Sequence, residues 1–132
     1  MDKNKNTVND LRLGNWLYYT EETKFPMQVS ALGKDWVQLD FEGNDGDCFE
    51  NNGDEIYPIP LNGKMLENIG FKLIEDYLYL GEFTLNYYKD GFMICVNEND
   101  RHITKPISYV HELQNLYYDL TDKELEIKRE WL

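Results

Sequence analysis

Val-His-Glu-Leu-Gln-Asn-Leu-Tyr-Tyr-Asp-Leu-Thr-Asp-Lys-Glu-Leu-Glu-Ile, residues 110–127, is the stretch that decides the fold. Its first part carries apolar side chains at steps of three and four residues, which predicts an amphipathic helix with one buried face. The members of this stripe are Val110, Leu113, Leu116, Tyr117 and Leu120. Ser108 precedes the stripe and is expected to cap the helix. Such a helix has to bury its apolar stripe against a second layer of structure.

The last part of the same stretch has a different period. Thr121-Asp-Lys-Glu124 matches a capping box, so a new turn is expected to start at Thr121. Leu125 and Ile127 alternate with polar neighbours, and this two-residue period is typical of a strand. We therefore expect the chain to end in a strand that extends toward residues 129–131.

The predicted helix begins with a His-Glu pair that is typical of zinc proteases, but the motif is incomplete. Such a protease needs a second histidine four residues after the first, on the same helical face. That position holds Asn115, and the other histidine, His102, lies outside the helix. An amide does not replace an imidazole as a zinc ligand. We therefore expect His111 to form hydrogen bonds where the helix meets a sheet, and we predict no metal site.

The N-terminal half, residues 9–60, predicts short strands in close succession after a disordered N-terminus at residues 1–8. The expected strands are residues 16–19, 27–32 and 36–41. Alternation in the second strand places Met27, Val29 and Ala31 on one face. This spacing is typical of an SH3-like small β-barrel or meander.

The C-terminal half, residues 61–132, predicts a mixed lobe. Asn62 is expected to cap a short helix that ends before Gly70. A proline-containing extended segment at residues 56–61 leads into this helix. The expected strands lie at residues 71–74, within 77–88, at 92–96 after an Asp-Gly turn, and at 102–105. The predicted class is therefore α+β: a β-rich lobe, a short helix, a small antiparallel sheet and one longer packed helix, forming one compact unit.

The composition is that of a folded cytoplasmic protein. The chain has 132 residues with 42% hydrophobic side chains, enough for one domain that folds without disulfides or metal. It contains no apolar run of about 18 residues, and its first ten residues do not resemble a signal peptide. Cys48 and Cys95 are therefore expected to be free thiols. The net charge of −12 disfavours direct binding to DNA or RNA, because phosphates would be repelled.

Residues 42–55 form a predicted acidic loop that is a candidate partner-binding surface. Asp45, Asp47 and Glu50 are its central acids. An EF-hand that starts at Asp45 would place Phe49 and Ile56 at ligand positions, so the calcium template fails. A solvated loop that keeps the protein in solution is the interpretation we favour over the binding of a basic partner or the mimicry of nucleic acid.

Aromatic side chains on the first predicted strands are the other candidate surface. Trp16, Tyr18 and Trp36 could bind a partner, as aromatic residues do in many SH3-like domains. Strand alternation places Trp16 and Tyr18 on one face and Tyr19 on the other, so one of these sets is expected to belong to the core.

Catalytic and cofactor motifs are weak in this sequence. Neither serine lies in a Gly-x-Ser-x-Gly elbow, and the glycines form no phosphate-binding loop. Cys95 and His102 could meet across a hairpin, but packing roles are favoured. Pairs of carboxylates cannot be identified from sequence, since any two of the 25 acids can meet in space. We predict no cofactor.

Three stretches, distributed between residues 11 and 127, carry a family resemblance. They are residues 11–18 (Leu-Arg-Leu-Gly-Asn-Trp-Leu-Tyr), residues 59–71 (Ile-Pro-Leu-Asn-Gly-Lys-Met-Leu-Glu-Asn-Ile-Gly-Phe), and residues 109–127. In these stretches the chain resembles a set of small uncharacterised proteins encoded in prophages and mobile elements of gut-dwelling anaerobic bacteria. That family has no assigned activity, so the resemblance implies no catalytic residue. It implies a phage-type accessory protein in a bacterial cytoplasm.

Three functional hypotheses follow. The first is a non-enzymatic interaction module with a protein partner, bound through the acidic loop and the N-terminal aromatic residues. The second is an acidic DNA mimic that inhibits a nucleic-acid enzyme, which requires acids aligned on one face. The third is a hydrolase whose carboxylate site has no sequence signature, which requires two acids in a deep pocket.

Overall fold

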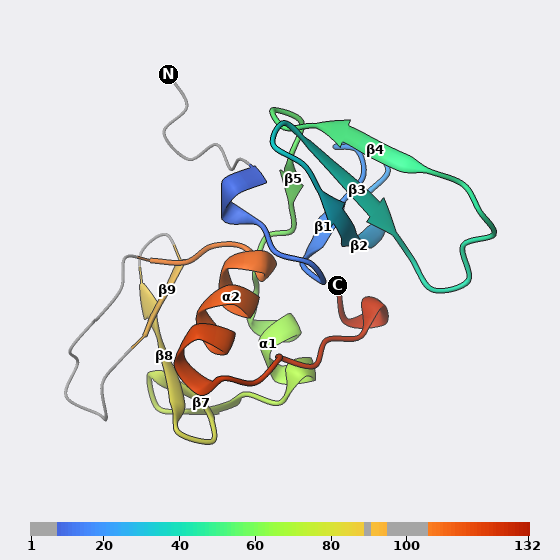
Figure 1. Ribbon diagram of the computed structural model, residues 1–132. Helices are drawn as coiled ribbons and strands as arrows, with labels where there is room; N and C mark the ends of the chain where they lie inside the picture. The colour runs from blue at the N-terminus through green and yellow to red at the C-terminus, as the bar shows by residue number, and fades with distance from the viewer. Residues whose placement is uncertain (1–7, 89–90, 95–105) are drawn as a thin grey trace.

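The computed structural model describes residues 8–88, 91–94 and 106–132, which form an α+β protein with two antiparallel sheets and two α-helices (Figure 1). The predicted α+β class is confirmed. Neither sheet closes into a barrel, and each forms the framework of one lobe. The predicted disordered N-terminus falls outside the described ranges except for Val8, which starts a short 3-10 helix, η1 (Val8–Asp10).

The first sheet has five strands in the order β4-β3-β2-β1-β5. The strands are β1 (Trp16–Tyr18), β2 (Pro26–Leu32), β3 (Trp36–Asp40), β4 (Phe49–Asn52) and β5 (Tyr57–Pro58). Its buried face carries alternate residues of each strand, since successive side chains point to opposite sides. The core cluster on this face contains Leu11, Leu17, Met27, Val29, Val37 and Leu39. The predicted first three strands are therefore confirmed.

A bulge in β2 changes one predicted inward residue. The pairing with β3 runs Val29 to Leu39 and then Ala31 to Gln38, which leaves Ser30 without an opposite residue. An extra residue on one strand reverses the alternation beyond it. Leu32 therefore packs on the core cluster, and the expectation that Ala31 continues the inward face is wrong.

The predicted acidic loop at residues 42–55 contains a strand. β4 pairs with β3 in a four-residue register in which Phe49 lies opposite Leu39. The Phe49 ring contacts Tyr19 and Phe41 at centroid distances of 5.1 and 5.9 Å. The half-buried Phe49 packs this strand on the core, and Asn51 Nδ2 donates to the Tyr19 carbonyl at 2.8 Å. The strand otherwise contains Glu and Asn, and such a sequence has no alternating pattern to predict it. The expectation of a continuous loop is corrected accordingly.

The second lobe packs its helices on a four-stranded meander in the order β6-β7-β8-β9. Its elements are α1 (Gly63–Ile69), β6 (Lys72–Ile74), β7 (Tyr77–Leu80), β8 (Phe83–Tyr88), β9 (Gly91–Ile94), α2 (Val110–Thr121) and η2 (Arg129–Trp131). Figure 1 shows α2 lying against this sheet. The core contains Leu66, Phe71, Leu78, Phe83, Leu85 and Leu113, with Leu116 and Tyr117 beside it.

Predicted features of this lobe are largely confirmed. Asn62 Oδ1 accepts a hydrogen bond from the Met65 amide at 2.9 Å and so caps α1. Gly70 ends that helix with a positive φ of 126°. Tyr88 pairs with Gly91, so β8 and β9 form the predicted hairpin. Cys95, His102 and the strand expected at residues 102–105 lie outside the described residues.

Both ends of α2 differ from the prediction. Tyr109, not Ser108, is the N-cap residue, and Glu112 accepts hydrogen bonds from both backbone amides at 2.8 and 3.1 Å. At the other end, Thr121 closes the helix: its hydroxyl donates to the Tyr117 carbonyl at 2.7 Å. The capping-box motif therefore does not start a new turn. Leu120, the last residue of the stripe, is exposed.

The final strand is not formed. Leu125 is buried and Ile127 is half-buried against the second core, so their alternation reflects an extended segment that is held by side chains. The chain then turns into η2, where the Arg129 guanidinium lies 4.7 Å from the centre of the Phe25 ring. This contact brings the C-terminus back to the first lobe.

A buried seam joins the two lobes. Trp16, Ile59, Met65 and Val110 form its apolar part. Its polar part connects the segment before β1 to α2: the Trp16 amide donates to Gln114 Oε1 at 2.9 Å, and Gln114 Nε2 donates to the Gly14 carbonyl at 3.1 Å. Buried amides need partners of this kind. The seam fixes β1 against the start of α2.

Asn115 occupies the position that a zinc protease would fill with histidine, and it belongs to this seam. Its Oδ1 accepts from Asn15 Nδ2 at 2.8 Å and from Arg12 Nε at 2.9 Å, and its Nδ2 donates to the Asp10 carbonyl at 3.0 Å. The residue that ends the metalloprotease interpretation thus has a structural role between the lobes.

Across the described parts of the chain, none of the helices has both the length and the apolar character needed to cross a membrane.

Candidate functional site

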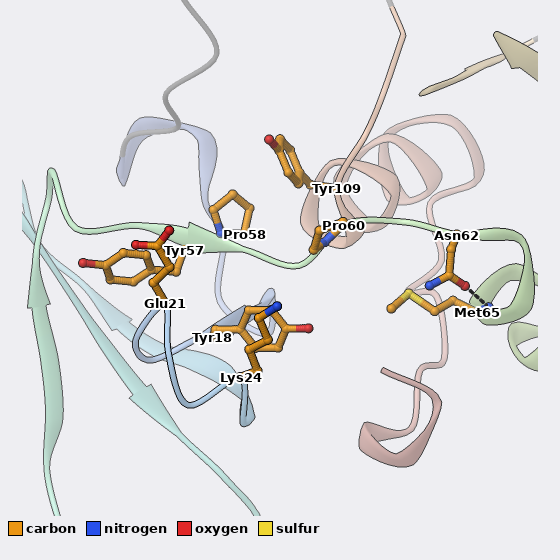
Figure 2. Close-up of a pocket in the computed structure, with 9 residues that line it drawn as sticks. All are labelled: Tyr18, Glu21, Lys24, Tyr57, Pro58, Pro60, Asn62, Met65 and Tyr109. Carbon is orange, nitrogen blue, oxygen red and sulfur yellow. Dashed lines mark hydrogen bonds between the residues drawn. The ribbon is translucent and has the colours of Figure 1, made fainter. Parts of the chain in front are cut away.

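An open groove lies where the two lobes meet, beside the seam (Figure 2). Its volume is about 500 Å³, within the range of ligand pockets. Segments far apart in the sequence contribute its walls: the end of β1 with the β1–β2 turn, β5 with the chain that follows it, the first turn of α1, and the start of α2. The lining residues are Tyr18, Glu21, Lys24, Tyr57, Pro58, Pro60, Asn62, Met65 and Tyr109.

The register of β1 and β5 positions the first two tyrosines. Tyr18 lies directly opposite Tyr57 in this antiparallel pair. Residues in that relation point to the same face of a sheet, with Cβ atoms about 5 Å apart. Both residues therefore lie on one face of the sheet and line the groove, with their rings pointing apart in Figure 2. Tyr18 also packs on the seam cluster, which holds its ring in place.

The two prolines of the β5 segment shape the floor of the groove. Beyond β5, the chain pairs with the residues before α2: the Leu61 amide donates to the Ser108 carbonyl at 2.8 Å, and the Val110 amide donates to the Ile59 carbonyl at 2.8 Å. Pro58 and Pro60 alternate with these paired residues. Proline has no N–H, so these two positions offer no backbone donor to a ligand.

The second lobe contributes the opposite wall. Pro60 forms an isolated bridge with Tyr109, and in Figure 2 the Tyr109 ring stands on one side of the β5 segment with Tyr18 on the other. Met65 follows the capped start of α1 and is mostly buried at the far end of the groove. A flexible, polarizable thioether beside tyrosines gives this end an adaptable apolar surface.

The electrostatic environment of the groove is acidic at the Tyr57 end. Partial burial raises the pKa of Tyr57 above its ordinary value of 10.0, and the carboxylates of Glu55, Glu21, Glu22 and Asp54 raise it further. Burial also raises the pKa of Tyr18. Both phenols therefore keep their protons at neutral pH and can donate hydrogen bonds. Lys24, which has a left-handed backbone with φ of 51°, is the amine among the lining residues.

His111 lies behind the groove. It is fully buried, and its ring stacks on Tyr109 at a centroid distance of 6.1 Å and an interplanar angle of 14°. Burial lowers the pKa of His111 to about 4, against a smaller opposing effect of Asp10. The imidazole is therefore neutral at physiological pH and supports the Tyr109 ring from within.

The structure separates the two surfaces that the sequence singled out. Tyr18 lines the groove, but Trp16 is buried in the seam with 8% exposure. Trp36 is 36% exposed and its indole covers Gly33 at the β2–β3 turn, apart from the groove-lining residues. The predicted aromatic residues are therefore not gathered into one surface.

The predicted acids lie at the opposite edge of the first sheet. Asp45 and Asp47 are exposed in the β3–β4 connection, and Glu50 is exposed on β4. Asn44 organises this connection by donating to Asp40 Oδ1 at 2.7 Å and to the Asp47 carbonyl at 2.8 Å. None of these three acids is among the residues that line the groove. No cluster of metal-ligating side chains occurs within the described residues.

Most groove residues were missed from sequence. Tyr57 and the two prolines belong to the segment that is predicted only as extended, Met65 lies in the predicted short helix, and no role is predicted for Tyr109. The available signal was the sequence Tyr-Pro-Ile-Pro at residues 57–60, in which an aromatic ring precedes alternating prolines. That signal does not reveal which other rings face it.

In comparisons with known proteins, no family model, no curated protein and no solved structure matches this chain. The groove geometry is therefore the main support for a functional proposal.

Proposed function

We propose that this protein is a non-enzymatic protein-interaction module that binds its partner in the groove between the two lobes. The observation that carries the proposal is the lining of the groove: three tyrosines, two prolines and a methionine, supplied by both lobes. Tyrosine is enriched at protein interfaces because its ring buries a large apolar area while its hydroxyl still forms a hydrogen bond.

The chemistry of the lining favours binding over catalysis. Among the described lining residues, Glu21 is the single carboxylate, and both Glu21 and Lys24 are exposed at the rim. A hydrolase with a carboxylate pair needs two acids that converge on one bond. Tyr18 and Tyr57, whose pKa values are raised, serve as hydrogen-bond donors at neutral pH. The hydrolase and DNA-mimic hypotheses stay predictions that no particular contact favours.

The proposed setting is the cytoplasm of a bacterium, as an accessory protein of a phage or mobile element. The resemblance of residues 11–18, 59–71 and 109–127 supports this setting. We also interpret the first sheet as an open SH3-like meander, which the successive pairing of β1 to β4 and the return of β5 beside β1 support. In this interpretation the groove lies at the β1–β5 edge of that meander.

Site-specific photo-crosslinking tests the proposed function. A photoreactive phenylalanine analogue replaces Tyr57 in the groove or, as a matched control, Trp36 on the same sheet outside the groove. After irradiation in the cells that contain the protein, cross-linked peptides are identified by mass spectrometry. We expect one discrete protein partner from position 57 and not from position 36. Equal labelling from both positions, or none from position 57, contradicts the proposal.

A further inference from the structure

We propose that the occupant of the groove is a short, extended, proline-containing segment of a partner protein that carries an arginine or lysine at the Tyr57 end. This inference rests on the proposed function and names the class of ligand.

The backbone of the groove floor decides the mode of recognition. A peptide that extends a sheet as an added strand needs alternating N–H and C=O groups on the free edge. Pro58 and Pro60 lack N–H groups, and the amides of Leu61 and Val110 already donate to backbone carbonyls. The β5 edge therefore cannot form a regular ladder with a ligand. Recognition has to occur through the faces of side chains.

A polyproline II segment is suited to such a surface. It has no internal backbone hydrogen bonds and is pre-ordered, so its binding loses little conformational entropy. Aromatic-lined grooves bind such segments by packing rings against prolines. Tyr18, Tyr57 and Tyr109 provide these rings, and their hydroxyls can donate to the exposed carbonyls of the segment. Met65 closes the apolar end.

Charge sets the orientation of the segment. The carboxylates of Glu55, Glu21, Glu22 and Asp54 all act on Tyr57, and Lys24 is the one amine among the lining residues described by the structure. A cation placed over the Tyr57 ring would meet both the aromatic face and these acids. Arginine suits that position best, because its planar guanidinium stacks on rings and pairs with carboxylates. A segment with an acid there would be repelled.

Matched peptides test this proposal by fluorescence anisotropy with the full chain. The probe is a labelled peptide of about nine residues that contains Pro-x-x-Pro repeats and a terminal arginine. Two matched peptides replace either the arginine by glutamate or all prolines by alanine. We expect each replacement to weaken binding at least tenfold, and we expect the affinity of the arginine peptide to fall as salt increases.

Variants of the protein locate the peptide. Tyr57→Ala is expected to weaken binding about tenfold, and Glu21→Gln combined with Glu22→Gln about threefold to tenfold for the arginine peptide alone. Trp36→Ala, on the same sheet, is expected to bind as the wild type does. Circular dichroism checks that each variant is folded. If Tyr57→Ala does not fold, Tyr57→Leu replaces it, because leucine lacks the aromatic ring and hydroxyl but retains an apolar side chain.

Failures of the two proposals are distinguishable. A partner cross-linked at position 57, together with no discrimination among the three peptides, overturns the proline and arginine assignment and leaves the interaction module standing. A partner cross-linked there through an acidic or proline-free segment also overturns the assignment. If neither cross-linking nor peptide binding is detected, both proposals fail. Tight binding of the arginine peptide that is unchanged by Tyr57→Ala overturns the placement in the groove.

Discussion

The seam and the groove lie side by side and are formed by the same elements. Polar and aromatic side chains are buried in the seam, whereas in the groove they remain partly exposed. In the seam, Gln114 is buried and uses its amide to join α2 to the backbone before β1. In the groove, Tyr57 and Tyr109 remain partly exposed. Buried polar groups with complete hydrogen bonding fix a unique arrangement, whereas exposed rings keep surface available for a partner. The difference indicates that the seam maintains the geometry and the groove binds.

The largest effect on stability is expected from Gln114→Ala. The substitution leaves the buried Trp16 N–H without its partner, which costs about 1–3 kcal/mol, and it also opens a cavity where a buried side chain was. The Gly14 carbonyl keeps its other donor, Gln28 Nε2, at 3.0 Å. We expect a loss of about 3 kcal/mol in the free energy of unfolding, measured by urea denaturation. Asp119→Ala is the matched control on an exposed position of the same helix, expected to change stability by less than about 0.5 kcal/mol. Equal effects would contradict a distinct role for the seam.

The second effect concerns pH and His111. The pKa of His111 is lowered from 6.5 to about 4 in the folded protein, so the unfolded chain binds the proton more tightly. This contribution to stability is fully present above about pH 6.5 and is lost as the pH falls toward 4. The expected loss is about 3 kcal/mol, since one pKa unit corresponds to about 1.4 kcal/mol.

Denaturation of the wild type and of His111→Gln at pH 7 and pH 4.5 measures this effect. Carboxylates titrate in both proteins, so the difference between their pH dependences reports on the imidazole. The wild type is expected to lose more stability than the variant on acidification. Parallel pH profiles would show that His111 is not held neutral by burial.

A smaller effect on stability is expected in the groove itself. Tyr57→Phe removes one hydroxyl from a partly exposed ring at the edge of the sheet. We expect thermal denaturation to show a change below about 0.5 kcal/mol, together with severalfold weaker peptide binding because one hydrogen-bond donor is lost. If this variant is destabilised as strongly as Gln114→Ala, the groove contributes to stability as much as the seam does, and the proposed difference between them is wrong.

The smallest effects are expected at the remote edge of the first sheet. Asp45→Asn combined with Asp47→Asn neutralises two exposed acids in the β3–β4 connection. Stability is expected to change by less than about 0.5 kcal/mol. Peptide affinity is expected to change by less than twofold, because neither acid lines the groove and salt screens exposed charges. A marked loss of partner binding in the same variant would instead assign the acidic surface a direct contact.

Sequence reasoning succeeded where a pattern is local. The stripe on α2, the Asn62 cap, the Gly70 stop and the β8–β9 hairpin all follow from residue types within a few positions of each other. It failed for β4, in which Phe49 is the one apolar residue, and for the bulge at Ser30, which no alternation reveals. It also failed at the end of the chain, where alternation was correct but no neighbouring strand exists in the described structure to form a ladder.

The candidate site was accessible from sequence only in part. Tyr18 was singled out because it lies on an aromatic strand, yet Trp16, two residues before it and equally aromatic, is buried in the seam. The choice between core and surface for two side chains on one face depends on where α2 packs. No periodicity within β1 contains that information.

Residue order alone thus determined the α+β class, the apolar faces of the main elements and the strongly acidic character, since each depends on composition or on spacing along the chain. The tertiary structure decided the groove. Its walls come from β1, β5, α1 and the start of α2, and only the antiparallel pairing of β1 with β5 and the hydrogen bonds of the seam bring Tyr18, Tyr57 and Tyr109 around one cavity. Contacts between distant segments depend on packing free energy summed over the whole core, and no short stretch of sequence encodes that sum.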